Sequence, residues 1–284
     1  MFALVPTMLC RMRSKLSAVV LCLFAVSCGD PTTGSLLEPY TAKDQEVIRV
    51  VTSGGFAAAY NLLAPQFETE TGLRLVTHYG SSSGGAPDSI PMRLARGEVF
   101  DVVILSAGSL ANLTEKGAVL SNGQVALVES KIGMAVKQGA YKPDISSEEA
   151  FAETLLKAKS IGFSASASGT YLSQQLWPRM KLWQALENKS LRIQSERVAS
   201  VVARGDVEIG FQQISEILPI SGADYVGPIP ESLQKVTVFS AGITRQAKNP
   251  DGAARLLAYL SSEKVAATVA STGLDPISAA TVSQ

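Results

Sequence analysis

The chain has 284 residues, of which 46% are apolar, and its 25 basic residues balance its 25 acidic residues. This length and apolar content are sufficient for one large or two small domains with a buried core. A nucleic-acid-binding protein normally gathers an excess of basic residues on one face, so the balanced charge argues against that class.

The N-terminal segment has the organisation of a secretory signal. Basic residues lie between positions 11 and 15, an apolar run covers 16–24, and small residues lead to Cys28. The apolar run is shorter than the roughly 20 residues that a transmembrane helix needs. These features predict a signal peptide over residues 1–28 and a periplasmic mature protein. The residues before Cys28 also resemble a bacterial lipoprotein processing site, which would make Cys28 a lipidated membrane anchor. Cleavage nearby to a soluble periplasmic protein is the alternative.

Processing fixes the thiol content and the charge of the mature chain. The three cysteines of the full sequence lie at or before Cys28, so the folded part has no thiol for a disulfide, a metal site or a nucleophile. Removal of residues 1–27 takes away three basic residues and no acidic one, which leaves 22 basic against 25 acidic residues. The mature protein is therefore slightly acidic.

Residues 29–45 are rich in Gly, Pro, Thr and Ser and predict a flexible tether. Beyond them, the apolar periodicities of strands and helices alternate. This alternation predicts an α/β protein with βαβ units and mainly parallel sheets. Strands are expected at 47–51, 73–77, 101–105, 132–136, 160–163, 207–212 and 236–243. Helices are expected from the first Ser-Gly-Gly turn to Thr71, at 89–96 and 148–158, from 171 with a break near Pro178, at 198–203, and after Asn249.

Two of these strands run into small, hydroxyl-rich turns that precede helices. The turns cover residues 52–55 and 80–85. A helix N-terminus offers free backbone N–H groups and the positive end of the helix dipole. The turns therefore predict sites that hold an anion without a charged side chain. Ordinary tight turns and helix caps are the alternative use of such residues.

The order and spacing of these segments resemble the type 2 periplasmic solute-binding proteins, and in particular their molybdate-binding branch. Residues 47–77 resemble the opening of such proteins, with a strand, a Ser-Gly turn, a helix and a second strand. Further matching motifs are Gly80-Ser81-Ser82 and the segments 100–106, 205–210 and 248–250. The resemblance covers nearly the whole mature chain.

The resemblance implies a fold of two α/β lobes, each a mainly parallel sheet flanked by helices, with the ligand in the cleft between them. It places the first lobe at residues 46–128 plus 240–284 and the second at 129–239. It also implies a monomeric, non-enzymatic receptor with no cofactor and no bound metal cation. Such a receptor captures a tetrahedral oxyanion, molybdate or tungstate, and docks on an inner-membrane ABC permease.

In that family, hydroxyl and backbone N–H groups from both lobes hold the oxyanion. The matching positions are Ser53 and Gly54, Ser82 with Ser81 or Ser83 as register alternatives, Ser168, Gly169 and Thr170, Val201, and Gln213. Gln213 departs from the tyrosine of the molybdate branch, and its amide can both donate and accept hydrogen bonds. An organic carboxylate or another polar anion is therefore the alternative ligand. A role in lining the hinge is the alternative for Gln213.

Two other function classes stay open. A secreted hydrolase that uses a loop serine is the weaker one, because His78 is the only histidine and no Ser-x-x-Lys pattern lies in the loops. A sensory or adaptor lipoprotein without a transport role is the other.

Overall fold

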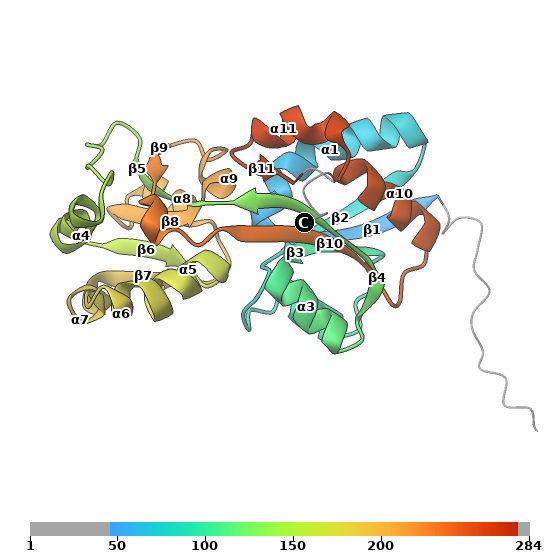
Figure 1. The fold of residues 1–284 in the computed structure, drawn as a ribbon, viewed down its shortest axis with the longest axis horizontal. Coiled ribbons are helices and arrows are strands. Elements are labelled where there is room, and N and C mark those ends of the chain that lie inside the picture. Colours follow the sequence, from blue (N-terminus) through green and yellow to red (C-terminus); the bar gives the residue numbers. More distant parts are fainter. Residues whose placement is uncertain (1–45, 278–284) are drawn as a thin grey trace, which may run out of the picture. The chain divides into compact units, whose positions relative to one another are not determined.

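The computed structural model describes residues 46–277 (Figure 1). The predicted signal peptide, the lipidation site at Cys28 and the tether over 29–45 lie outside the described residues. Within residues 46–277 the chain forms two β-sheets flanked by helices, which confirms the predicted α/β class. Each helix in this part of the chain is too short or too polar to span a bilayer.

The first sheet is built from two separate parts of the chain. Its strands are β1 (Val47–Ser53), β2 (Arg74–Gly80), β3 (Val102–Ser106), β4 (Val119–Ser130), β10 (Thr237–Thr244) and β11 (Asp275–Pro276). They lie in the order β11-β4-β10-β3-β1-β2. Strand β1 is parallel to β2 and β3, whereas β10 is antiparallel to β3 and β4.

The second sheet is formed by one continuous stretch of the chain. Its strands are β5 (Ile132–Lys137), β6 (Ile161–Ser164), β7 (Ser190–Ile193), β8 (Ile209–Gln213) and β9 (Ala223–Pro228). They lie in the order β7-β6-β8-β5-β9. Strand β6 is parallel to β7 and β8, whereas β5 is antiparallel to β8 and β9.

Each sheet is therefore mixed in direction, which corrects the expectation of mainly parallel sheets. The parallel strands are those that helices connect, as the alternation in the sequence predicted. Strands β5 and β10 are different because the chain reaches each of them from a strand of the other sheet. A parallel neighbour needs a long crossover within one sheet, and these two strands have none.

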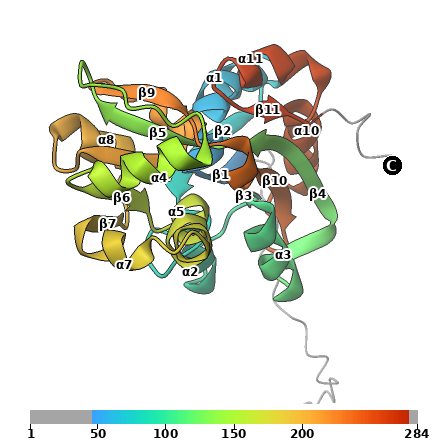
Figure 2. The same cartoon turned by 60° about the vertical axis from the view of Figure 1, so that its left-hand side comes forward.

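The helices flank both sheets (Figure 2). With the first sheet lie α1 (Gly54–Thr71), α2 (Ile90–Ala95), α3 (Ala107–Glu115), α10 (Pro250–Leu260) and α11 (Ala266–Ala270). With the second lie α4 (Glu148–Lys157), α5 (Ala167–Tyr171), α6 (Trp177–Arg179), α7 (Trp183–Leu186), α8 (Val198–Arg204) and α9 (Ile214–Ile217). Short 3-10 turns cover Glu187–Lys189, Glu231–Leu233 and Glu263–Val265, and a π-helical turn at Leu172–Leu176 joins α5 to α6. The predicted break near Pro178 is the end of α6.

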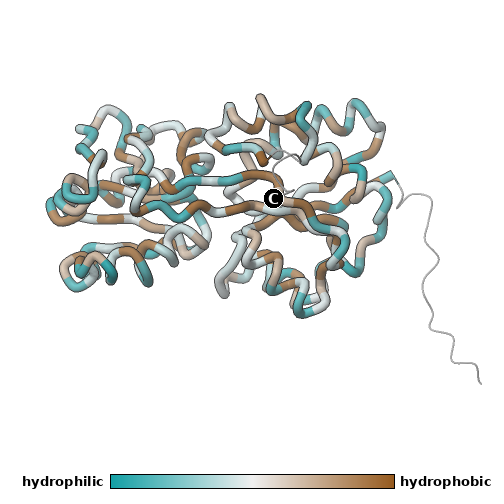
Figure 3. Tube along the Cα trace, in the orientation of Figure 1, coloured by the Kyte–Doolittle hydropathy of each residue, from teal (hydrophilic) through white to brown (hydrophobic). Residues whose placement is uncertain are grey.

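The apolar residues of the central strands alternate between two cores, one on each face of the first sheet. Val50 and Ile104 belong to the core beneath α1 and α10. Their neighbours Val51 and Val103 belong to the core beside α2 and α3. Figure 3 shows the resulting hydrophobic stretches along these strands. Burial on both faces explains why the strands are continuous apolar runs in the sequence. The same packing holds the carboxyl ends of these strands in place.

The two sheets share one strand pattern. The order β2-β1-β3-β10 in the first corresponds to β7-β6-β8-β5 in the second. In the first sheet the chain runs from β1 to the edge strand β2 and then to β3, on the other side of β1. In the second sheet it runs in the same way from β6 to β7 and then to β8. Ligands of open α/β sheets bind outside the carboxyl ends of the strands at this reversal. The ends in question are Ser53 and Ser106 in the first sheet, and Ser164 and Gln213 in the second.

The chain passes between the sheets twice, from β4 to β5 and from β9 to β10. Figure 1 shows β4 and β10 running side by side, and they pair over most of their length. We call residues 46–130 and 237–277 the first lobe and residues 131–236 the second lobe. The boundaries predicted from the sequence, 128/129 and 239/240, fall inside β4 and β10. The division of the chain into domains at those positions stays a prediction.

Candidate functional site

A cavity of about 210 Å³ lies between the two lobes, where strands of both sheets end. The residues that line it follow β1, β2, β6, β7 and β8, so the cavity occupies the position that the strand order favours. They are residues 53–55, 80–82, 164–168, 193–197, 212 and 213, together with Ala57, Tyr79, Asp88, Glu216 and Phe239. We call this space the interlobe cavity.

Ser53 is the last residue of β1 and precedes the 18-residue helix α1. Its side chain is 2% exposed, and its Oγ has no hydrogen-bond partner among residues 46–277. A buried hydroxyl without a partner is destabilising by about 1 to 3 kcal/mol. This hydroxyl does not cap α1 either, although it stands at the N-cap position. Both Ser53 and the first turn of α1 therefore offer unused hydrogen-bond donors to an anion in the cavity.

The second predicted loop also reaches the cavity, through Ser81 and Ser82. The backbone N–H of Ser106 donates to Ser82 Oγ over 3.1 Å, which leaves the hydroxyl proton of Ser82 available for a ligand. The hydroxyl of Ser81 instead donates to the carbonyl of Ser83 over 2.8 Å. Of the register alternatives, Ser82 is therefore the one whose hydroxyl can serve as a donor in the cavity.

Glu216 is a lining residue that the sequence analysis missed. It lies on the short helix α9, directly after β8, and its carboxylate faces the first turn of α1. A Cβ atom on Gly54 would overlap the Glu216 Oε1 atom, so only glycine at position 54 permits this approach. Burial raises the pKa of the Glu216 carboxyl to about 7, although the charge of Arg197 and a hydrogen bond from Gln212 both lower it. The cavity thus contains a carboxyl group that changes charge near neutral pH.

Arg197 supplies the positive charge of the cavity. Among the described lining residues it is the one lysine or arginine, and it precedes α8 at the N-cap position. Its guanidinium forms no hydrogen bond or ion pair within residues 46–277, and the side chain is half-buried. Glu196 beside it is already paired with Arg204, at 2.8 Å. The Arg197 guanidinium therefore remains available to a carboxylate of a ligand.

Gln213 lines the cavity, but its amide is engaged at the crossing between the lobes. Ser130 Oγ at the end of β4 donates to Gln213 Oε1 over 2.8 Å, and Gln213 Nε2 donates to Thr237 Oγ1 at the start of β10 over 3.1 Å. Ser215 then links the lobes a second time, because its Oγ donates to the carbonyl of Gly55 over 2.7 Å. These contacts correspond to the hinge role, the alternative that the sequence left open for Gln213.

Of the remaining predicted positions, one lines the interlobe cavity and three do not. Ser168 lines the cavity and its Oγ lies 3.2 Å from that of Ser164. Gly169, Thr170 and Val201 are absent from the lining. A Cβ atom on Gly169 would overlap the backbone of Ser164, so this glycine lets α5 pack against the end of β6. Val201 is buried in the core between α8 and the second sheet. Within residues 46–277 there is no cluster of three side chains that could hold a metal ion.

A family model described as bacterial extracellular solute-binding protein matches residues 48–275. The chain belongs to this family. The family assignment confirms an extracytoplasmic protein with the solute-binding fold of ABC transporters, as the resemblance implied. It does not identify the ligand, so molybdate or tungstate is not shown.

A curated relative corrects one expectation. The chain is 42% identical over 238 residues to a protein from a Pseudomonas species named aconitate isomerase, and the match covers 84% of this chain and 91% of that protein. Because this relative is an enzyme by name, the expectation of a non-enzymatic receptor is overturned. The sequence analysis had also missed Glu216, a buried carboxyl of the cavity that no periodicity or motif indicates.

Solved structures show the same fold at low sequence identity. The periplasmic molybdate-binding protein of Azotobacter vinelandii has a TM-score of 0.66 at 20% identity, with 80% of this chain and 98% of that chain covered. The sulfate-binding protein SubI of Mycobacterium tuberculosis has a TM-score of 0.63 at 17% identity, with 82% and 88% covered. These neighbours confirm the predicted two-lobed periplasmic binding protein fold.

Proposed function

We propose that this protein binds an unsaturated tricarboxylate, aconitate, in the interlobe cavity and isomerises it by moving a proton with Glu216. The observation that carries the proposal is the carboxyl group of Glu216 inside a cavity that otherwise offers hydrogen-bond donors and one free guanidinium. The relative named aconitate isomerase supplies the substrate class.

Isomerisation of aconitate can proceed by proton movement alone. A base removes a proton from the methylene carbon, and the electron pair of that C–H bond spreads over the adjacent double bond. An acid then delivers a proton to the far carbon, so the double bond moves by one position and either geometric isomer can form. Substrate and product have the same atoms, and neither an oxidant nor a cofactor is needed.

Glu216 has the properties that this reaction requires. A general acid–base group works best when its pKa lies near the pH of the reaction, because both protonation states are then populated. Burial raises the pKa of Glu216 to about 7, within this range. Asp88 and Glu196, the other carboxylates of the lining, are exposed, and Glu196 is held by Arg204. These differences support Glu216 as the residue that exchanges protons with the substrate.

The remaining donors fit the carboxylates of such a substrate. The Ser53 hydroxyl suits one carboxylate, since it lacks a partner within residues 46–277, and the first turn of α1 beside it presents backbone N–H groups. The Ser82 hydroxyl can contribute to the same or a neighbouring group. Arg197 can bind a second carboxylate with its planar guanidinium. Together they orient a polyanion whose reacting carbon lies beside Glu216.

A solute receptor of an ABC transporter is the second candidate function. The two-lobed fold and the hinge contacts of Gln213 favour it, because such receptors close on their ligand. Molybdate as that ligand would leave Glu216 without a role, since molybdate takes no part in carbon–hydrogen chemistry. A carboxylate ligand, the alternative from the sequence, agrees better with Arg197.

The test is an activity and binding assay on the purified protein. Proton NMR follows trans-aconitate and cis-aconitate over time, and calorimetry measures the binding of both isomers, molybdate and sulfate. We expect interconversion by the unmodified protein, and a rate at least 1,000-fold lower for Glu216→Gln with binding retained. Glu153→Gln, on the exposed face of α4, is the matched control and should leave the rate unchanged.

Three outcomes would decide against parts of the proposal. Binding of aconitate without turnover would leave a carboxylate receptor. Micromolar binding of molybdate without binding of aconitate would restore the oxyanion receptor implied by the sequence. Full activity of Glu216→Gln would exclude Glu216 as the acid–base group.

A further inference from the structure

The loop between β2 and α2 carries Ser82 but has almost no apolar anchor of its own. We call residues 80–88, which read Gly-Ser-Ser-Ser-Gly-Gly-Ala-Pro-Asp, the serine loop. Of its side chains, Ser82 alone is fully buried. A segment with few buried apolar contacts and several glycines is expected to open locally at little cost in free energy. The order of this loop must therefore come from polar contacts.

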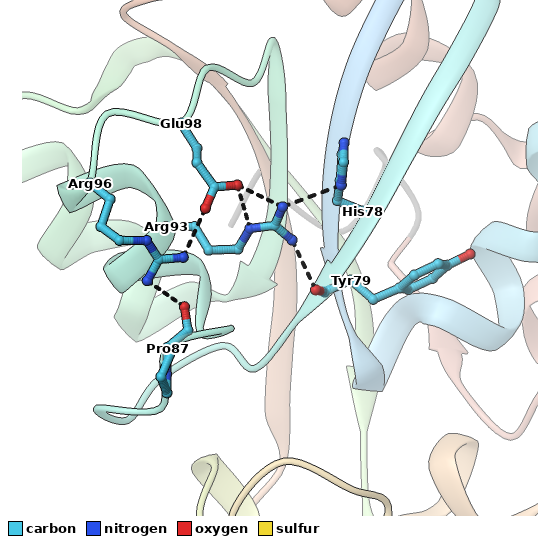
Figure 4. Close-up of polar contacts among 6 residues, drawn as sticks. All are labelled: His78, Tyr79, Pro87, Arg93, Arg96 and Glu98. Carbon is cyan, nitrogen blue, oxygen red and sulfur yellow. Dashed lines mark hydrogen bonds and ion pairs between the residues drawn. The ribbon is translucent and has the colours of Figure 1, made fainter.

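Two arginines on and just after α2 hold the two ends of the serine loop (Figure 4). At its start, Arg93 Nη1 donates to the carbonyl of Tyr79 over 3.2 Å. At its end, Arg96 Nη1 donates to the carbonyl of Pro87 over 2.5 Å. The ends of the loop are thus fixed to one short helical segment by two rigid, permanently charged groups.

One carboxylate joins the two arginines. Glu98 Oε2 accepts from Arg93 Nε over 2.8 Å, and Glu98 Oε1 accepts from Arg96 Nη2 over 2.8 Å. These bonds lower the pKa of Glu98, the bond from Arg93 more than the bond from Arg96. Glu98 therefore stays ionised and locks both guanidinium groups in the orientation that the loop carbonyls require.

The guanidinium of Arg93 also contacts His78 and Phe100. Its Nη2 lies 3.2 Å from His78 Nδ1, and because a guanidinium can only donate, this ring nitrogen is the acceptor. The guanidinium also lies over the ring of Phe100, 5.0 Å from its centroid, and the side chain is 14% exposed. Surface salt bridges contribute little, but this arginine is largely buried and makes contacts in three directions. A lysine could not make these contacts at once.

The polar contacts continue from the ends of the loop to the cavity. The backbone N–H of Ile90 donates to the carbonyl of Ser81 over 3.0 Å, and Ser89 Oγ donates to the carbonyl of Gly84 over 3.0 Å. Ser82 is then fixed by the N–H of Ser106. A movement of either loop end would therefore displace the hydroxyl that faces the ligand.

We propose that Arg93 and Arg96, bridged by Glu98, are positioning residues that hold the serine loop and place Ser82 for ligand binding. They line no part of the interlobe cavity and act through the loop alone. The placing of Ser82 for ligand binding rests on the proposed function, whereas the ordering of the serine loop by the two arginines does not.

The first test needs no ligand. Hydrogen exchange measured by mass spectrometry reports the opening of peptides that cover residues 80–88. We expect at least tenfold faster exchange of this loop in Arg93→Lys than in the unmodified protein, and a smaller acceleration in Arg96→Lys. The matched control is Arg245→Lys, since Arg245 Nε also donates to a loop carbonyl, that of Gly117 over 2.7 Å, and Arg245 forms no hydrogen bond to residues 80–88 within the described part of the chain. Unchanged exchange of residues 80–88 in Arg93→Lys would overturn the proposal.

The second test separates positioning from a general loss of stability. We expect Arg93→Lys to raise the KM for trans-aconitate about tenfold with kcat within twofold, while Arg245→Lys changes neither. In a Ser82→Ala background the same substitution should raise KM less than twofold, because its effect passes through Ser82. If Arg93→Lys raised KM by the same factor with and without Ser82→Ala, the proposal would be overturned. If the unmodified protein binds trans-aconitate without turnover, the proposed isomerase fails, and dissociation constants from calorimetry replace KM in the same comparison.

Discussion

Replacement of Glu216 by glutamine is expected to make the protein more stable above pH 7 and to leave its stability near pH 4 unchanged. The carboxyl of Glu216 has an ordinary pKa of 4.5 in the unfolded chain and a pKa of about 7 in the folded protein. Between these values the unfolded chain has released its proton while the folded protein retains it. The free energy of unfolding contributed by this group therefore falls as pH rises from about 4.5 to 7.

The magnitude follows from the same two pKa values. Each pKa unit corresponds to about 1.4 kcal/mol, so the ionised carboxyl destabilises the fold by roughly 3 kcal/mol at most above pH 7. Contact of the carboxyl with the cavity reduces this destabilisation. We therefore expect Glu216→Gln to raise the free energy of unfolding by about 1 to 3 kcal/mol at pH 8. Glutamine has the same size and stays neutral, so it should fill the position beside Gly54 without this penalty.

The assay is urea unfolding of both proteins at pH 4, 6 and 8. The difference between their free energies of unfolding isolates Glu216, because all other titrating groups are shared. Glu153→Gln on the surface of α4 is the control, and its difference from the unmodified protein should not vary with pH. A Glu216→Gln difference that stays constant from pH 4 to pH 8 would refute the argument that burial shifts this carboxyl.

Three further predictions concern the cavity and the hinge. Ser53→Ala should leave stability unchanged or slightly higher, because the hydroxyl has no partner in the described part of the chain, yet weaken carboxylate binding about tenfold or more in calorimetry. Arg197→Gln should raise the pKa of Glu216 further, so the rising limb of the pH–rate profile should move to higher pH; an unmoved limb would argue against their coupling. Gln213→Leu should lower the free energy of unfolding in urea by about 1 to 3 kcal/mol, because it leaves two hydroxyls on β4 and β10 without partners, and an equal stability would exclude the hinge role.

The sequence predicted those parts of the fold and site that depend on local patterns. Strand β1 and helix α1 are clear from their periodicities, and Ser53 lies where one passes into the other. The serine loop was equally visible as a polar interruption between β2 and α2. Each of these features depends on neighbours within a few residues, which is why a single sequence was sufficient.

Three features that were missed depend on contacts between distant segments. Strand β4 was not predicted, because its first half contains the polar run Ser121-Asn122-Gly123 and its pairing with β10 gives no local signal. Glu216 lies on a four-residue helix that has no periodicity, and its pKa is set by burial against Gly54, far away in the chain. The directions of β5 and β10 likewise depend on the passage of the chain between sheets.

The position of Glu216 on a separate short helix has a consequence for protein engineering. In the proposed function the serines that bind the ligand lie at or just after strand ends and Arg197 precedes α8, whereas the acid–base group lies on α9. Recognition and reactivity can therefore be altered one at a time in a fold of this type. If the proposed function holds, installing a carboxyl three positions after the equivalent strand, opposite a glycine, offers a route from a passive receptor to a proton-transfer enzyme.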